Sequence, residues 1–236
     1  MEFVIRWYVG HRGHILNEVS MFYIFPQAVS KEDCNYFIED CLKKYKGEMY
    51  DSVVGSSDPE RFPNGVIDES YRKGKVVFLP NENDKLHKTI YSHVKEANDN
   101  FFGFRLTSHE SVQFAEWNKG DFYNWHQDYQ NPQHAGMSSA HFHVKGECRK
   151  LSLTLALSEF DAFEGGSLEF FNGLNGDGYT EVTIDGRKHS PKEVKDLARK
   201  QGTIIVFDSR DYHRISPVTS GTRHSLVCWT HGPHFI

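Results

Sequence analysis

The sequence has few cysteines, no long apolar run and no excess of positive charge. Its four cysteines are spaced neither as a zinc site nor as the framework of a disulfide-rich domain. No apolar stretch approaches the length that spans a membrane, and the first residues lack the apolar segment of a secretory signal. We therefore expect a cytoplasmic protein, kept in a reducing compartment, with no membrane partner.

The charge balance argues against a further class of partner. The 236 residues include 27 basic and 32 acidic side chains, which give a formal net charge of -5. Proteins that bind nucleic acids usually present a basic field to the phosphates, so we expect no nucleic-acid partner. The length suits one large domain, and we expect a single domain over 1–236, with helical support and a lid loop in 1–100 and a β core in 101–236.

The first part of the chain has the pattern of a support for a sheet. Apolar runs at 22–25 and 76–79, each closed by a proline, predict strands. Apolar side chains at helical spacing predict helices over 30–47 and 83–100. The polar segment 51–74 is rich in glycine, proline and serine. Such a loop is either a lid over a site or an idle surface loop, and we treat it as a candidate lid.

Short β-like runs separated by turns dominate the rest of the chain, as in a sandwich or jelly roll. The runs are 112–117, 122–127, 151–157, 167–171, 180–184, 203–207 and 223–230. Along 150–158, leucines alternate with small or polar side chains, among them Thr154. The polar face either lines a cavity or meets water, and periodicity alone does not separate these two readings. We expect a mainly β fold with flanking helices.

A candidate metal site lies near the middle of the sequence. If residues 125–128 are extended, His126 and Asp128 project to the same face, because side chains alternate along a strand. With His213 as a third ligand they would form the two-His-one-carboxylate facial triad of non-haem Fe(II) sites. The His-x-Asp tripeptide alone is weak evidence in a chain with 14 histidines.

An ordered series of further residues surrounds these candidates. The series comprises Gln113, Gly120, Tyr123, His126 and Asp128, then Arg149, then Gly165 to Phe170, Gly202 with Phe207, and finally His213, Pro217, Val218, Gly221, Arg223 and Trp229. On these residues the chain resembles the Fe(II)- and 2-oxoglutarate-dependent dioxygenases, specifically their prolyl 4-hydroxylase-like branch. The resemblance implies a double-stranded β-helix, a jelly roll of the cupin type, buttressed by N-terminal α-helices.

The resemblance also implies roles for individual residues. The metal ligands and catalytic residues would be His126, Asp128 and His213. Arg223, ten residues after the last ligand, would bind the far carboxylate of 2-oxoglutarate, because a guanidinium matches a carboxylate with two parallel hydrogen bonds. Three further residues are candidates for cosubstrate binding, namely Tyr123, Thr154 and Ser225. The implied cofactors are Fe(II), 2-oxoglutarate and O2, with ascorbate as an additional candidate.

The chain departs from the branch at one position. Where a tyrosine is common nine residues before the first ligand, this chain has Trp117. An indole donates one hydrogen bond and accepts none, unlike a phenol. Tyr123 and Asn118 are the candidates to replace that phenol. A separate insertion, 129–147, contains His134, His141 and His143, which either belong to a polar flap or bind a second metal.

The implied reaction is hydroxylation of an unactivated C–H bond, coupled to oxidative decarboxylation of 2-oxoglutarate to succinate and CO2. Our leading substrate is a prolyl residue of a peptide or protein, as in prolyl hydroxylases of the procollagen-proline type. A free amino acid or another small molecule is the alternative within the enzyme class. The alternative from another class is a non-catalytic β-helix module that binds a metal or a small ligand.

Overall fold

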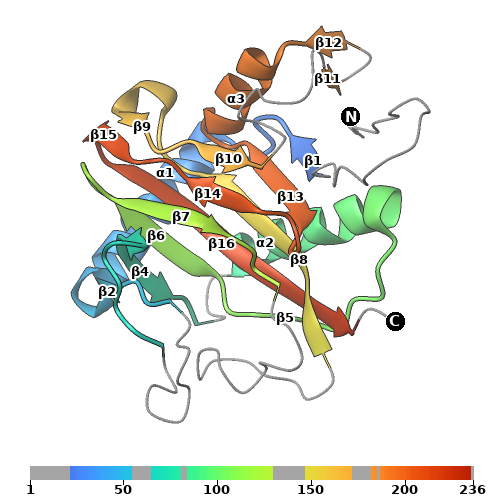
Figure 1. The fold of residues 1–236 in the computed structure, drawn as a ribbon, viewed down its shortest axis with the longest axis horizontal. Helices are drawn as coiled ribbons and strands as arrows, with labels where there is room; N and C mark the ends of the chain where they lie inside the picture. The colour runs from blue at the N-terminus through green and yellow to red at the C-terminus, as the bar shows by residue number, and fades with distance from the viewer. Residues whose placement is uncertain are drawn as a thin grey trace.

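Strands form most of the fold, and helices flank them (Figure 1). The computed structural model describes residues 22–54, 65–80, 84–129, 147–171, 182–184 and 187–234. The strands are β1 (Phe22–Phe25), β2 (Tyr50–Asp51), β3 (Arg72–Lys73), β4 (Lys75–Phe78), β5 (Ser108–His109), β6 (Gln113–Trp117), β7 (Phe122–His126), β8 (Glu147–Ala156), β9 (Phe163–Gly165), β10 (Leu168–Phe170), β11 (Val182–Ile184), β12 (Arg187–His189), β13 (Ile204–Asp208), β14 (His213–Ile215), β15 (Val218–Gly221) and β16 (Arg223–Pro233). The helices are α1 (Lys31–Tyr45), η1 (Lys46–Glu48), α2 (Asp84–Ala97), η2 (Asn98–Phe102), η4 (Phe160–Ala162) and α3 (Pro191–Arg199).

Two antiparallel sheets face each other and form the β-helix. The large sheet has the order β1-β13-β8-β16-β6-β4-β2, with β5 paired to β16, and the small sheet has the order β10-β14-β7-β3. Strand β16 lies between β8 and β6, so Ser225 faces Ala156 on one side and Ala115 on the other. The expected mainly β fold of the double-stranded β-helix type is confirmed.

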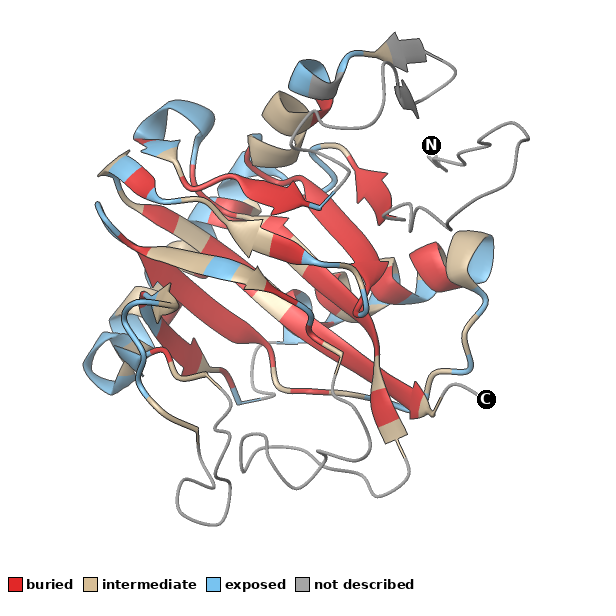
Figure 2. Cartoon of the chain, in the orientation of Figure 1, coloured by how far each residue is buried: buried red, intermediate tan, exposed pale blue. Residues whose placement is uncertain are grey.

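The outer face of the large sheet is covered by the two N-terminal helices. The leucines of β8 pack there against Phe37 and Cys41 of α1 and Ile90 of α2, in one buried cluster. Helix α1 begins after Ser30, whose hydroxyl accepts a hydrogen bond from the backbone N–H of Asp33, as expected for an N-cap. Burial is therefore continuous through the central strands, whereas the outward faces of the helices are exposed (Figure 2).

The inner face of β8 resolves an ambiguity of the sequence. Ser152 is fully buried and Thr154 lines an internal cavity between the sheets. The polar face of this strand therefore borders a cavity. All four cysteines are buried and free, in agreement with the expectation of no disulfide.

Helix α3 was not expected from the sequence. It begins with a capping box in which Ser190 and Glu193 bond each other's backbone N–H groups, and Pro191 occupies the first turn. Val194 of this helix packs in a small cluster with Phe170 and Ile205. Within the part of the chain that the structure describes, no helix is long and apolar enough to cross a membrane.

The two ends of the candidate lid bond to each other. The backbone N–H of Ser52 donates to Gly74, and Val54 and Val66 form a β-bridge. Residues 55–64, most of the insertion 129–147 with its three histidines, and residues 1–21 lie outside the described residues. The lid, a second metal and the single-domain organisation over 1–236 therefore stay predictions.

Candidate metal centre and cosubstrate pocket

The three predicted ligands meet at one end of the small sheet. His126, at the end of β7, lies directly opposite His213, at the start of β14, and their ring centroids are 4.2 Å apart. Asp128 follows β7 and places Oδ1 3.6 Å from Nε2 of His126 and Oδ2 3.5 Å from Nε2 of His213. All three residues are buried, and their ligand atoms lie within 4.8 Å of one another. The structure therefore brings this predicted set together.

The outer nitrogens of both rings are held by backbone carbonyls. Nδ1 of His126 lies 2.7 Å from the carbonyl oxygen of Asn124, and Nδ1 of His213 lies 2.9 Å from that of Asp211. A carbonyl accepts only, so each Nδ1 donates and each Nε2 points inward, where it can offer a lone pair to a metal ion. Two imidazole nitrogens and one carboxylate thus face one another. Such a donor set fits a divalent cation, and its composition fits non-haem Fe(II).

The protonation states agree with this fit. Burial acts to raise the pKa of Asp128, but the facing His213 and His126 outweigh it and hold that pKa well below its usual range. Burial, together with His126, lowers the pKa of His213 to about 4. Near neutral pH the site therefore offers an ionised carboxylate and a neutral imidazole, the forms that bind metal ions.

A hydroxyl pair orients the carboxylate. Ser152 Oγ donates to Oδ2 of Asp128 at 2.7 Å and lies 2.9 Å from Oγ of Ser209. Both serines are fully buried. Sequence reasoning did not single them out, although Ser152 belongs to the alternating polar face of β8. A side chain that holds a metal ligand in place is expected to influence metal affinity.

A cavity of about 50 Å³ opens beside the three ligands and extends between the sheets. Strand β16 contributes alternate residues to its wall, because side chains on one face of a strand are two positions apart. These residues are Arg223, Ser225, Val227 and Trp229. Tyr123 and Thr154 also line this cavity, so it brings the three expected metal ligands together with Arg223, Ser225, Tyr123 and Thr154.

Arg223 is a buried cation with no carboxylate partner among the described residues. Its side chain is 7% exposed, and Nη1 donates to Oγ of Ser225 at 3.0 Å. Burial, helped by the nearby Arg199, lowers the pKa of Arg223 to about 10, so the guanidinium is still charged at neutral pH. An unpaired buried charge is costly, and a ligand carboxylate would compensate it.

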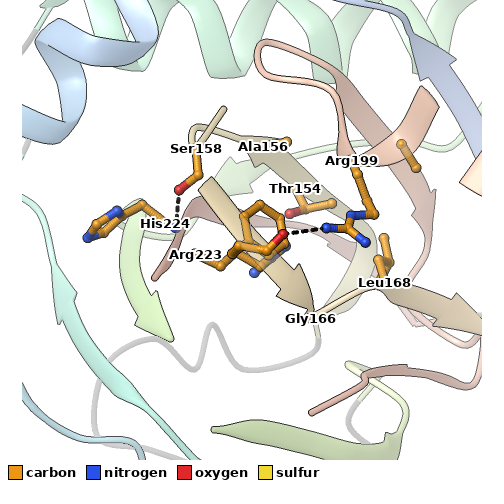
Figure 3. A pocket seen from close by; sticks show the side chains of 10 residues that line it. Thr154, Ala156, Ser158, Gly166, Leu168, Arg199, Arg223 and His224 are labelled. Carbon is orange, nitrogen blue, oxygen red and sulfur yellow. Dashed lines mark hydrogen bonds between the residues drawn. The ribbon is translucent and has the colours of Figure 1, made fainter. Parts of the chain in front are cut away.

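A second, smaller cavity of about 10 Å³ lies beyond Arg223 and has room for about one water molecule (Figure 3). Arg199, the last residue of α3, extends toward it and was not predicted. Nη2 of Arg199 donates to the carbonyl oxygen of Phe163 at 2.9 Å, while its buried Nε has no hydrogen-bond partner in the described part of the chain. A helix-period reading of 190–199 could have indicated the helix, although not where this side chain points.

The position of the unusual tryptophan is now defined. Trp117 lines the metal cavity, and its indole N–H is buried without a hydrogen-bond partner among the residues that the structure describes. Tyr123 stacks on the ring of His126, with centroids 3.5 Å apart. The prediction of Asn118 as a substitute is not supported, because its amide contacts Glu116 and Thr222 and it does not line this cavity.

A buried ion-pair cluster supports the opposite end of the wall. Arg149 donates from Nε and Nη2 to the two carboxylate oxygens of Glu110, at 2.5 and 2.7 Å. Nε2 of His231 lies 2.7 Å from Oε1 of the same carboxylate. The guanidinium of Arg149 also lies 4.1 Å from the ring of Trp229. The cluster therefore fixes Trp229 against the cavity.

Comparisons of the sequence agree with this site. Residues 112–231, half of the chain, match the 2OG-Fe(II) oxygenase superfamily. A PKHD-type hydroxylase of Synechococcus sp. (strain CC9605) is 30% identical over 119 residues, and one of Prochlorococcus marinus is 31% identical over 118 residues. Each alignment covers 50% of this chain and 40% of the relative, so the match spans less than half of the length of these curated relatives.

Solved structures show the same fold. A prolyl-4-hydroxylase of Pseudomonas putida superposes with a TM-score of 0.58 at 16% identity, over 90% of this chain and 93% of that one. A prolyl hydroxylase of Trichoplax adhaerens, in complex with a peptide fragment of the hypoxia inducible factor oxygen degradation domain, gives a TM-score of 0.59 at 15% identity, over 89% and 82%. At these identities the likeness establishes the fold, which is that of the prolyl hydroxylases.

Proposed function

The chain belongs to the 2OG-Fe(II) oxygenase superfamily, and we propose that it hydroxylates an unactivated C–H bond, with decarboxylation of 2-oxoglutarate to succinate and CO2. The observation that carries the proposal is the convergence of three acceptor atoms, from His126, Asp128 and His213, within 4.8 Å of one another. These residues would hold Fe(II). When bound there, the metal supplies the redox chemistry that couples decarboxylation to oxidation of the substrate.

The chain's own residues would bind and orient the cosubstrate. Arg223 would pair with its distal carboxylate, because this guanidinium is buried and has no carboxylate partner in the described part of the chain. Ser225 and Thr154 would supply hydroxyl groups on the same cavity wall. The N–H of Trp117 would donate to a cosubstrate oxygen, in place of the phenol that this position commonly carries.

The substrate that we favour is a prolyl residue of a peptide or protein. Two kinds of similarity support it, namely the PKHD-type hydroxylase relatives and the prolyl hydroxylase fold. A free amino acid or another small molecule is the second candidate, since the aligned region covers 40% of the relatives. We further propose that the chain forms a single catalytic domain and that ascorbate acts as a supporting reductant. A reducing, cytoplasmic compartment would suit the four free thiols.

The test is succinate release by the purified protein supplied with Fe(II), 2-oxoglutarate and proline-containing peptides. We expect turnover in the wild type and none in His126→Ala or Asp128→Ala, with His189→Ala on β12 as a matched histidine control. Fe(II) binding, measured anaerobically, should be lost in the first two variants only. A protein that binds Fe(II) and never decarboxylates 2-oxoglutarate would be a non-catalytic binding module, and undiminished turnover in Asp128→Ala would reject these ligands.

A further inference from the structure

A second guanidinium reaches the metal cavity from outside the motif series. Arg72 opens β3, the edge strand of the small sheet, and lies opposite Tyr123 of β7. Its side chain lines the same cavity as His126 and Asp128. The guanidinium carbon is 4.5 Å from the centre of the Tyr123 ring, which in turn stacks on His126. Arg72 is therefore positioned beside the candidate metal centre.

The contacts of Arg72 fix its position without an ion pair among the described residues. Nη1 donates to the carbonyl oxygen of Val53 and Nη2 to Oε1 of Gln113, each at 3.1 Å. Nε is buried and has no hydrogen-bond partner among the described residues. No carboxylate in the described part of the chain forms an ion pair with this side chain. Neutral acceptors hold the guanidinium, and one of its donors is still available.

The register of the large sheet separates Arg72 from the cosubstrate anchor. On β6, Gln113 lies opposite Val227 of β16, whereas Trp117 lies opposite Arg223. Four residues of strand span roughly 14 Å. Arg72 is hydrogen-bonded to Gln113, so its guanidinium lies near one end of the cavity, and Arg223 lies near the other. One 2-oxoglutarate molecule bound to Arg223 and to the metal would not reach Arg72. Arg72 could therefore bind a different anion.

A neutral donor lines the same cavity. The indole N–H of Trp229 is buried and has no hydrogen-bond partner among the described residues, and its ring is held by the guanidinium of Arg149. Arg149 is itself neutralised by Glu110, so it does not offer a free charge. Buried donors without acceptors are rare in folded proteins, and in a ligand cavity a bound acceptor would explain this one. Arg72 is then the charged member of this pair and Trp229 the neutral one.

The charges of a loaded site point in the same direction. A divalent metal with Asp128 keeps one positive charge, and Arg223 and Arg72 add one each. The dianion 2-oxoglutarate neutralises two of these three. The remaining positive charge lies in a mostly apolar cavity, where an anionic group on the second substrate would compensate it.

We propose that Arg72, with the indole N–H of Trp229, forms an anion subsite for the molecule that is hydroxylated, and that this substrate carries a carboxylate close to the oxidised C–H bond. The inference rests on the proposed function. The carboxylate has two possible sources, the α-carboxylate of a free amino acid or an acidic side chain beside a prolyl residue of a peptide.

The experiment measures binding to the full chain loaded with Mn(II) and 2-oxoglutarate, in which no turnover occurs. Titration calorimetry compares probes in matched pairs. The first pair is L-proline and L-prolinamide. The other two pairs are the blocked dipeptides acetyl-Pro-Glu-amide and acetyl-Glu-Pro-amide, each compared with the dipeptide that has glutamine in place of glutamate. We expect the carboxylate member of at least one pair to bind about tenfold more tightly than its amide. The pair that shows the difference identifies the source of the carboxylate.

Variants connect that preference to Arg72. In Arg72→Gln the preference for the carboxylate should disappear, while Arg72→Lys should keep part of it, and Lys73→Gln on the same strand should keep all of it. The Kd of 2-oxoglutarate should change less than about twofold in Arg72→Gln.

Equal binding within every pair, or no binding of any probe, would overturn the subsite. A loss of 2-oxoglutarate affinity in Arg72→Gln as large as that of probe binding would overturn it too, because Arg72 would then serve the cosubstrate. After either outcome the proposed function would still stand if the protein binds 2-oxoglutarate and this binding depends on Arg223. If the wild type does not bind 2-oxoglutarate, the proposed function itself would be contradicted.

Discussion

Trp117 lies directly opposite Arg223, on neighbouring strands of the large sheet. Trp117, the residue at which this chain differs from the family branch, is therefore paired with Arg223, the residue proposed to bind the cosubstrate. Gly74 permits the arrangement, because a Cβ at that residue would lie 2.8 Å from the Trp117 ring. The pairing of β6 with β16 and the close approach of Gly74 thus position the Trp117 indole next to Arg223.

Replacing Trp117 with phenylalanine removes the indole N–H and keeps an aromatic ring in the cavity. We expect the KM for 2-oxoglutarate to rise about fivefold to tenfold, since one hydrogen bond to an ionised group is lost. Fe(II) affinity, measured anaerobically, should be unchanged. A KM equal to that of the wild type would show that this indole does not contact the cosubstrate.

Substitution of Arg223 by leucine should raise the 2-oxoglutarate requirement at least a hundredfold, because the distal carboxylate would then be buried without a counter-charge. The discriminating measurement is the affinity of the Mn(II)-loaded protein for 2-oxobutyrate, which lacks the distal carboxylate. That affinity should be similar in the wild type and the variant. An unaltered requirement for 2-oxoglutarate would remove Arg223 from the site.

Arg199 should influence the same carboxylate from behind Arg223. Exchange to glutamine removes a positive charge beside the smaller cavity, so we expect the Kd of 2-oxoglutarate to rise severalfold and that of 2-oxobutyrate to stay constant. Lys200→Gln, an exposed neighbour, serves as the control. If the affinities for both acids fall together, Arg199 acts only by holding the segment that contains Phe163.

Ser152 donates to the carboxylate of Asp128 and should support metal binding without contacting the metal. In Ser152→Ala we expect Fe(II) affinity to fall about tenfold to a hundredfold, the usual effect of removing a partner of a ligand. Thermal unfolding of the metal-free variant provides the control for a purely structural loss. Equal Fe(II) affinity in the two proteins would contradict the role.

Glu110 gives a prediction for pH. Burial acts to raise its pKa, but Arg149 and His231 outweigh burial, so the pKa in the folded protein lies below its ordinary value. A depressed carboxyl pKa stabilises the fold above the pKa of the unfolded chain, about 4.3, and this stability is lost as the pH falls below it. Glu110→Gln should lower the free energy of unfolding by about 3 kcal/mol at pH 7 and by less at pH 4, in urea titrations. Glu39→Gln, on the exposed face of α1, should change neither value.

Local alternation predicted the β core, whereas the resemblance of an ordered motif series indicated His126, Asp128, His213 and Arg223 as site residues. His126 ends β7 and Asp128 follows it two residues later, so the short spacing keeps both near one site. Alternation along β16 places Arg223 and Ser225 on one face. These are also the positions in the motif series. Their convergence in space was the part that only the structure could show.

Arg72 and Arg199 could not be predicted in the same way. Each reaches the cavity from a segment outside the motif series, and each is placed by tertiary pairing, of β3 with β7 and of α3 against the sheet. The capping box at Ser190 was visible in the sequence and would have identified α3, but not the direction of the side chain at its last residue. Nothing in the spacing of 51–74 distinguishes Arg72 from its neighbours.

Strand β16 supplies the cavity wall with every second residue from Arg223 to Trp229. Its pairing with β8 and β6 therefore fixes the distance between the end of the cavity at Arg223 and the end at Trp229. Substitutions near Trp229 can alter which molecule is accepted while the cofactor end stays as it is. A register shift of one residue in β16 would instead turn all four side chains to the other face of the sheet. The cosubstrate end and the substrate end of the cavity would then both be lost.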